Sequence, residues 1–313
     1  MAVSTDLGFG VFCVELSDQK GKYPISGFLL LDRLKCVVET GPSGAHGNLL
    51  KALEERGVAL TDLDAIIVTH IHLDHSGGAG LLAQKCPNAK IYVHSRGAQH
   101  LTDPSKLEAS AREVYGPLFE TLFAPIVPVD PERLVVMKDG DRLEVGPGRV
   151  LEFYDAPGHA LHHFFVFDPK SQGIFSGDAA GMLYKDAELA HGASLCLPAT
   201  TPVQFDPAAM AATARRMKEL NPARIYYTHF GHTEKAVEML DEMLFWLPLY
   251  GSVAIEEYKR HRDVEQLAEF LFQRILAEAA ARGIPDDSHM NGLRFDCGLN
   301  AQGIAARVAY EER

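Results

Sequence analysis

A short segment of the chain, from His70 to His75, carries three imidazoles and one carboxylate at H-x-H-x-D-H spacing. Imidazole and carboxylate are donors that suit zinc, iron and manganese, at about 2.0–2.2 Å from zinc. Alternate residues of a loop that follows a strand point the same way, so His70 and His72 could hold one ion. Asp74 and His75 would then turn towards a second. Without a metal these groups would crowd together and need other polar partners, so the spacing favours a metal site over a polar turn.

Further donors follow at wider spacing, and each is a weaker signal alone. The candidates are His159 in the run A-P-G-H, Asp178 in F-S-G-D, and His229 with His232 in T-H-F-G-H. A bare Gly-Asp pair is common in turns, so the prediction for Asp178 depends on its position after His159. These side chains extend the site only if the fold brings their elements together.

The clearest strand signals place two of these histidines at strand ends. Residues 64–69 are a buried apolar run that leads directly into His70, and residues 224–228 lead into His229 in the same way. Short β-rich stretches bounded by Gly, Pro and Asp predict the other strands, at residues 9–16, 25–31, 36–39, 90–94, 134–137, 150–155, 164–168 and 173–176.

Helices are predicted between these strands and after them. Asp206 is an N-cap followed by proline at the first helical position, so it begins a helix. Residues 96–128 break the strand pattern, and we expect a helical insertion there. Two helical stretches, residues 236–259 and 263–282, follow the last strand. Shorter helices are expected at residues 48–56 and 79–85.

The composition indicates a globular protein. Of 313 residues, 47% are hydrophobic and 23% are charged, so we expect a substantial core. The net charge of -12 and the lack of a basic cluster argue against a nucleic-acid partner. The first residues lack the basic and apolar regions of a signal peptide, and no apolar run is long enough to span a bilayer. Five scattered cysteines without C-x-x-C spacing are typical of a reducing compartment, so we expect a cytoplasmic protein, with a homodimer left open.

Together the donor motifs resemble the signature of the metallo-β-lactamase superfamily, in the same order, between residues 9 and 232. The A-P-G-H run resembles the family's P-G-H, which implies that His159 is the third ligand of the first metal. The G-D pair implies that Asp178 bridges both metals. The E-T-G turn resembles the family's D-T-G turn, with Glu39 in place of aspartate. The resemblance therefore implies a binuclear site made by His70, His72, Asp74, His75, His159, Asp178 and His229.

The last ligand has two candidates. His229 stands where some members of the family carry a T-H-F histidine, whereas His232 matches the F-G-H form of lactonase-like and glyoxalase-II-like members. We favour His229 because it repeats the strand-end position of His70, which would leave His232 behind the ligands or near the substrate. We expect His163 to orient a ligand. Tyr184 is a weaker candidate for a substrate contact, as in lactonase-like members, against an ordinary loop tyrosine.

The fold implied by the resemblance is of the α/β class, a four-layer αββα sandwich with the metals at the sheet edges. Residues 1–235 would form the catalytic domain, with residues 236–313 as a helical extension packed on it. Two divalent metals, zinc first and iron or manganese as alternatives, would supply a bridging hydroxide as nucleophile. Asp74 would orient this hydroxide, and Asp178 would relay its proton. The implied reaction is hydrolysis of an ester, lactone, thioester or amide in a small molecule.

Other branches of the superfamily fit the sequence less well. Flavodiiron reductases usually place Glu where His72 stands and carry a flavodoxin domain, which these residues do not show. A tRNA-processing nuclease needs a basic surface, and a secreted β-lactamase needs a leader. Glyoxalase-II-like thioesterases, lactonase-like enzymes and mono-iron persulfide dioxygenases remain. The rival from another class is a catalytically silent, metal-binding regulatory protein, against which the complete ligand set argues.

Overall fold

The computed structural model describes residues 3–16, 25–193, 195–200, 204–290 and 292–313, and the chain divides into two compact units. Unit 1 consists of Met1–Asp155, His162–Gly177 and Arg224–His232, and unit 2 of Ala156–Leu161, Asp178–Ala223 and Thr233–Arg313. Each unit is therefore built from three separate segments. The boundary expected at residue 235 divides the chain differently and stays a prediction.

A seven-stranded sheet in unit 1 contains the first strands of the chain in sequence order. From β1 to β4 the strands pair antiparallel, and from β4 to β7 they pair parallel. Parallel strands are covered on both faces, which explains the buried apolar run of Ala65, Ile66 and Ile67 in β5. The strands are β1 (Ser4–Asp6), β2 (Val11–Glu15), β3 (Ser26–Leu31), β4 (Lys35–Val38), β5 (Leu63–Ile67), β6 (Lys90–His94) and β7 (Leu134–Met137).

A second, six-stranded sheet has the order β15-β14-β11-β10-β9-β8. From β8 to β11 successive strands pair antiparallel, whereas β14 lies parallel to β11. β8 is not among the predicted strands, because charged residues such as Arg142 and Glu144 weaken its strand signal. The strands are β8 (Arg142–Gly146), β9 (Arg149–Asp155), β10 (Phe164–Asp168), β11 (Gly173–Gly177), β14 (Arg224–Tyr227) and β15 (Gly231–Thr233).

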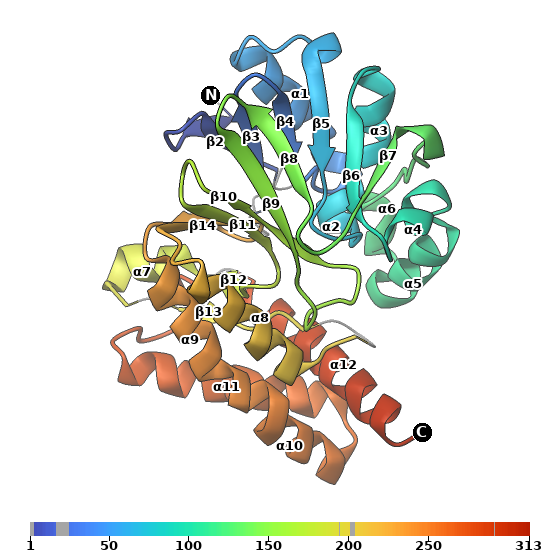
Figure 1. The fold of residues 1–313 in the computed structure, drawn as a ribbon. Helices are drawn as coiled ribbons and strands as arrows, with labels where there is room; N and C mark the ends of the chain where they lie inside the picture. The colour runs from blue at the N-terminus through green and yellow to red at the C-terminus, as the bar shows by residue number, and fades with distance from the viewer. Residues whose placement is uncertain (1–2, 17–24, 194, 201–203, 291) are drawn as a thin grey trace. The chain divides into compact units, whose positions relative to one another are not determined.

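The core of unit 1 has two layers. Between the sheets, Phe28 packs with Phe164 and Phe175 among other apolar side chains, and the rings of Phe28 and Phe175 meet edge-on at 5.5 Å. A second apolar cluster lies on the other face of the seven-stranded sheet, where α1 (His46–Glu55) and α3 (Ala79–Lys85) cover it (Figure 1). Unit 1 is thus a helix–sheet–sheet sandwich, as the expected fold class requires.

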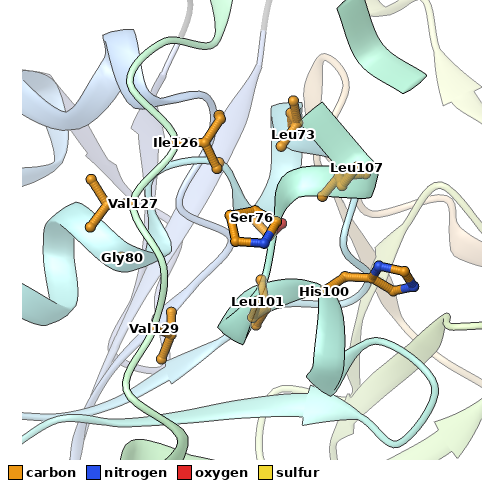
Figure 2. Close-up of a pocket in the computed structure, with 11 residues that line it drawn as sticks. Leu73, Ser76, Gly80, His100, Leu101, Leu107, Ile126, Val127 and Val129 are labelled. Atoms are coloured by element: carbon orange, nitrogen blue, oxygen red, sulfur yellow. The ribbon is translucent and has the colours of Figure 1, made fainter. Parts of the chain in front are cut away.

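The insertion predicted at residues 96–128 is helical, and it packs on α2 (Leu73–Ser76), the short helix that carries part of the donor motif. Leu73 is buried in a cluster with Phe119 and Phe123 of the insertion. The helices of the insertion are α4 (Ala98–Thr102), α5 (Ser105–Tyr115) and α6 (Leu118–Leu122). A small, mostly apolar cleft lies at the same contact (Figure 2), lined by residues that include Leu73, Ser76, His100, Leu101, Leu107 and Val127. The insertion therefore supports α2 through apolar contact.

Unit 2 is mostly helical, with one two-stranded sheet of β12 (Met182–Leu183) and β13 (Cys196–Leu197). The predicted helix at 236–259 is interrupted by a π-helical turn after Pro248, a residue that lacks a backbone donor. Within the helical extension expected at residues 236–313, the sequence predicts no separate helix after residue 282, because Gly298 and Gly303 of the last helix disfavour helix. The helices are α7 (Lys185–His191), α8 (Pro207–Glu219), α9 (Ala236–Pro248), α10 (Ala254–His261), α11 (Val264–Ala281) and α12 (Leu293–Glu311). Among the described residues, no helix of either unit is long and apolar enough to cross a membrane.

Candidate metal centre

Two loops of unit 1, after β5 and β14, lead into predicted ligands. Both strands end before the last residues predicted for them, so Thr69 and Thr228 lie in loops. The Thr69 N–H donates to Glu39 Oε1 at 2.6 Å instead of to a neighbouring strand. The Thr228 carbonyl accepts the Ser26 N–H at 2.6 Å. These bonds anchor the loops from which the two strand-end histidines extend.

The first histidine pair of the H-x-H-x-D-H run converges. Nε2 of His70 lies 2.8 Å from Nδ1 of His72, and the two rings are nearly perpendicular at 83°. On the far side of the first ring, Thr69 Oγ1 lies 3.1 Å from Nδ1 of His70. Because two nitrogen lone pairs facing each other repel, nitrogens this close must share a proton or a metal ion.

A second cluster in unit 1 joins Asp74, His75 and His229, whose donor atoms all lie within 4.8 Å of one another. Asp74 Oδ2 lies 3.6 Å from Nε2 of His75 and 3.4 Å from Nε2 of His229. The His75 side chain is fully buried, whereas Asp74 and His229 keep 23% and 17% of their side chains exposed. The cluster is therefore held by the interior on one side and open to solvent on the other.

Glu39 orients the buried histidine of this cluster. Its Oε2 lies 2.5 Å from Nδ1 of His75, and the residue is 1% exposed. The backbone of Glu39 is left-handed, with φ of 64°, in the turn that the sequence relates to a D-T-G motif. A carboxylate on one ring nitrogen makes the other a better metal donor and fixes its direction. Nε2 of His75 is the atom thus left for an ion.

In unit 2, His159 and Asp178 face each other, with Nε2 of the histidine 3.4 Å from Oδ2 of the aspartate. Nδ1 of His159 lies 2.9 Å from the Ala199 carbonyl oxygen. A carbonyl oxygen only accepts, so Nδ1 carries the proton and Nε2 carries the lone pair. Both side chains are buried. An imidazole lone pair and a carboxylate oxygen thus lie side by side.

The glycines of the P-G-H and G-D runs are required by close packing. Gly158 has φ of 129°, and a Cβ built on it would lie 2.4 Å from the backbone nitrogen of Met210 in α8. Gly177 has φ of 49°, and its Cβ would lie 2.3 Å from Thr69 Oγ1 and 2.7 Å from His163 Nε2. Any larger residue would displace backbone or the groups that support the ligands.

Two further histidines of unit 1 surround His70. His163 is 1% exposed and stacks on the His70 ring at 4.5 Å between centroids, and its role in orienting a ligand stays a prediction. His162 is 7% exposed, 6.1 Å from His70 and 5.3 Å edge-on to His72. The sequence reasoning did not single out His162. Its only signal is its position beside His163, shortly after the P-G-H run.

The two weaker site candidates have distinct settings. His232 is half-buried on β15, and it is not part of the cluster that includes His229. Tyr184, after β12, is 1% exposed, and its hydroxyl donates to Asp296 at 2.5 Å. Burial, and then the negative charge of Asp296, raise the pKa of Tyr184 well above its ordinary value. Contact of Tyr184 with a substrate stays a prediction.

The donor chemistry fits divalent transition metals. The converging groups offer imidazole nitrogen and carboxylate oxygen, without cysteine sulfur among those that the described residues bring together. Such a set suits zinc, iron or manganese. In three histidines a second polar group, from Thr69, Glu39 or Ala199, lies at the ring nitrogen that faces away from the site. This is the usual arrangement behind metal-ligating histidines.

A family model of the metallo-beta-lactamase superfamily matches residues 28–229, and the chain belongs to this superfamily. A metallo-beta-lactamase fold-containing protein of Sulfurisphaera tokodaii is 30% identical over 190 residues, which cover 59% of this chain and 68% of the relative. A putative diflavin flavoprotein of Thermosynechococcus vestitus is 26% identical over 87% of this chain and 44% of its own length. A hydroxyacylglutathione hydrolase of Nitrobacter hamburgensis is 33% identical over 42% of this chain and 38% of its own length.

The fold agrees with that membership. A solved metallo-beta-lactamase family protein of Thermus thermophilus has a TM-score of 0.66 at 20% identity, covering 97% of this chain and 93% of that chain. The expected metallo-β-lactamase fold is therefore confirmed. The chain spans less than half the length of the flavoprotein and of the hydrolase that it matches. Both a hydrolase and a flavoprotein thus occur among its relatives.

Proposed function

We propose that the chain is a metal-dependent hydrolase that cleaves a small-molecule ester, lactone, thioester or amide at a two-metal centre. The observation that carries the proposal is the cluster of Asp74, His75 and His229, with donor atoms within 4.8 Å of one another. We assign this cluster to one metal ion. A histidine with a buried carboxylate behind it, and an exposed opening beside the cluster, are features of a site that both binds an ion and admits a substrate.

We assign the other metal to His70, His72 and His159, with Asp178 as the ligand shared by both. The 2.8 Å approach of His70 to His72 supports the first part of this assignment. The 3.4 Å approach of His159 Nε2 to Asp178 Oδ2 supports the second. The order of these residues in the chain is that of the superfamily motif, which adds to the support from the family match.

The bound ions would act as Lewis acids and lower the pKa of water towards neutrality, so that hydroxide is available as nucleophile. In this proposal Asp74 orients the attacking water through Oδ2, which faces both His75 and His229. Asp178 then holds the released proton on a carboxylate oxygen until the leaving group takes it. His70 and His75 keep their direction through Thr69 and Glu39, so the donors need little rearrangement during the reaction.

The similarity to a hydroxyacylglutathione hydrolase over 42% of this chain supports a thioester or related acyl compound as the first class to try. The net charge of -12 disfavours a polyanion such as RNA.

The test is metal analysis of the purified chain, followed by an ester, lactone, thioester and amide panel. Two zinc, iron or manganese ions per chain and turnover of one class are expected. Asp178→Asn should lose metal and most of the activity, whereas Asp287→Asn, at an exposed position of the same unit, should keep both. Full metal content and full activity in Asp178→Asn would overturn the ligand assignment.

A second candidate function is an iron-dependent redox enzyme. The observation that favours it is the similarity to a diflavin flavoprotein over 87% of this chain, together with a donor set that accepts iron as well as zinc. Iron as the only bound metal, oxygen consumption with a persulfide or an electron donor, and inactivity on the hydrolase panel would select this candidate. A metal-loaded protein inert in both assays would point to a regulatory, non-catalytic role.

A further inference from the structure

One face of α12, the last helix of unit 2, forms side-chain hydrogen bonds to two separate segments of the chain. Asp296 and Asn300 are one turn apart on this helix and therefore lie on the same side. Asp296 Oδ2 accepts the hydroxyl of Tyr184. Asn300 Oδ1 accepts the N–H of Thr200 at 2.8 Å and its hydroxyl at 3.0 Å. The helix is thus bonded to the residue that directly follows β12 and to a residue shortly after β13, the two strands of one hairpin.

The β12–β13 hairpin joins the two bonded segments to each other. Met182 pairs with Leu197 across β12 and β13, and the Tyr184 N–H donates to the Leu195 carbonyl at 2.9 Å. The hairpin begins shortly after Asp178, the aspartate proposed to bridge the metals. A helix that is bonded after each strand of the hairpin therefore also limits movement of the chain that leaves this aspartate.

The decisive contact passes through a single peptide group. The N–H of Thr200 and the C=O of Ala199 belong to the same planar peptide bond. Asn300 Oδ1 accepts from that N–H at 2.8 Å, while the carbonyl oxygen lies 2.9 Å from Nδ1 of His159. A rotation of the peptide plane would break both bonds together. Bonds in such a chain also polarise one another.

Burial makes these bonds hard to replace by water. The exposed fraction is 3% for Asn300, 5% for Thr200 and 2% for His159. A buried donor or acceptor that loses its partner leaves the other group desolvated and unbonded. Without the Asn300 side-chain oxygen, the Ala199–Thr200 peptide would be free to rotate. The hydrogen bond between the Ala199 carbonyl and His159 would then be lost.

From this geometry we propose that Asn300 is a positioning residue for His159, acting through the Ala199–Thr200 peptide, with α12 as its rigid base. It sets the tautomer of the imidazole, with the proton on Nδ1 and the lone pair on Nε2. The inference rests on the proposed function in one respect, that His159 is a metal ligand. Asn300 touches neither metal nor substrate in this scheme.

The first readout is the tautomer of His159 in the full-length, metal-free protein. Long-range proton–nitrogen NMR of labelled histidine rings distinguishes the two neutral tautomers, and the His159 signal is the one absent from His159→Gln. The wild type should show the Nδ1–H tautomer alone. Asn300→Ala should show a mixture of both, whereas Asn300→Asp, which keeps the acceptor oxygen, should restore the single form.

The second readout is metal affinity, measured by competition with a chromophoric chelator. For the more weakly bound of the two ions, the affinity of Asn300→Ala should be at least about 10-fold lower than that of wild type. This is the range seen when a group behind a metal ligand is removed. Gln302→Ala is the matched control, since it removes a half-buried amide from the same helix, and it should change neither readout. If Asn300→Ala does not fold, Asn300→Ser serves instead, because its hydroxyl is too short to reach the Thr200 N–H.

The outcomes separate this inference from the proposed function. A folded Asn300→Ala or Asn300→Ser with the wild-type tautomer and wild-type metal affinity would overturn it, leaving α12 as packing alone. A mixed tautomer with weakened affinity would establish it. Failure of every hydrolase substrate would not touch either result, because neither readout uses substrate.

Discussion

Glu39 Oε2 lies 2.5 Å from Nδ1 of His75, while Oε1 of the same carboxylate accepts the Thr69 N–H at 2.6 Å. One carboxylate therefore fixes both a predicted ligand and the loop that precedes another. We predict that Glu39→Gln lowers metal affinity about 10- to 100-fold with the fold retained, because an amide cannot replace the charged acceptor on both sides. Chelator competition measures the effect.

A surface variant provides the control for this prediction. Glu54→Gln changes an exposed glutamate of α1 and should leave metal affinity unchanged. Glu39→Asp should fall between the two, because the shorter side chain keeps its charge but cannot hold both distances. Equal affinities for Glu39→Gln and wild type would show that this carboxylate does not support the metal.

A paired substitution distinguishes the two candidates for the last ligand. His229→Ala removes an imidazole whose Nε2 lies 3.4 Å from Asp74 Oδ2, so we predict loss of about one metal ion per chain. His232→Ala should retain the metal, although it can lower activity. Elemental analysis of both variants gives the answer, and the reverse pattern would transfer the ligand role to His232.

A buried ion pair in unit 1 predicts a large loss of stability. Arg149 is fully buried, and its guanidinium donates to Asp168 at 2.6 Å and 3.1 Å and to the Phe9 carbonyl at 2.8 Å. Arg149→Met leaves Asp168 buried without this partner and should cost about 3–5 kcal/mol of unfolding free energy. Urea denaturation measures the change.

An exposed pair on the same sheet provides the comparison. Arg142 bonds Glu152 at 2.7 Å, but its side chain is 68% exposed. Arg142→Met should therefore cost less than about 1 kcal/mol, because solvent screens the pair. Similar losses for the two variants would mean that burial does not strengthen the Arg149–Asp168 pair.

The pH dependence of stability can be tested at His46. Both ring nitrogens are buried and make no hydrogen bond within the described residues, and burial, then the charge of Lys85, lower its pKa. As pH falls through about 6.5, the ordinary histidine value, the unfolded chain takes up a proton that the folded chain resists. The contribution of His46 to stability is thus lost on acidification.

His46→Leu removes this proton linkage. We predict that the variant gains stability relative to wild type as the pH falls from 8 to about 5.5, in paired thermal melts at each pH. Gln99→Leu, at an exposed position of α4, replaces a side chain without an ionisable group, so its stability difference from wild type should not vary with pH. A constant difference between His46→Leu and wild type across this range would contradict the prediction.

The site residues that could be predicted from the sequence are those that stand next to a recognisable strand or turn pattern. His70 and His229 directly follow runs of strand-forming residues, and a strand signal needs only a few neighbours. The E-T-G turn is visible in the sequence, but the contact of Glu39 with His75 is not, because their positions are 36 apart and meet only through the fold.

Long-range contacts account for what the sequence did not reveal. Asn300 and Thr200 are 100 positions apart, and the helix that carries Asn300 contains glycines that weaken its helical signal. His162 has no motif of its own, and its stacking on His70 depends on how β10 follows the P-G-H turn. Such contacts arise from packing between elements, which no local pattern encodes.

Because β1 to β7 are neighbours in the sheet in the order in which they occur along the chain, each strand that leaves the ribosome can pair with one already synthesised. The first sheet can therefore assemble on the nascent chain, as N-terminal regions commonly do. At that stage residues 70–75 are present, while His159, Asp178 and His229 have still to be translated. Under the proposed ligand assignment, an ion captured early would meet only part of its ligands, so the centre could be completed only after residue 229 has been translated.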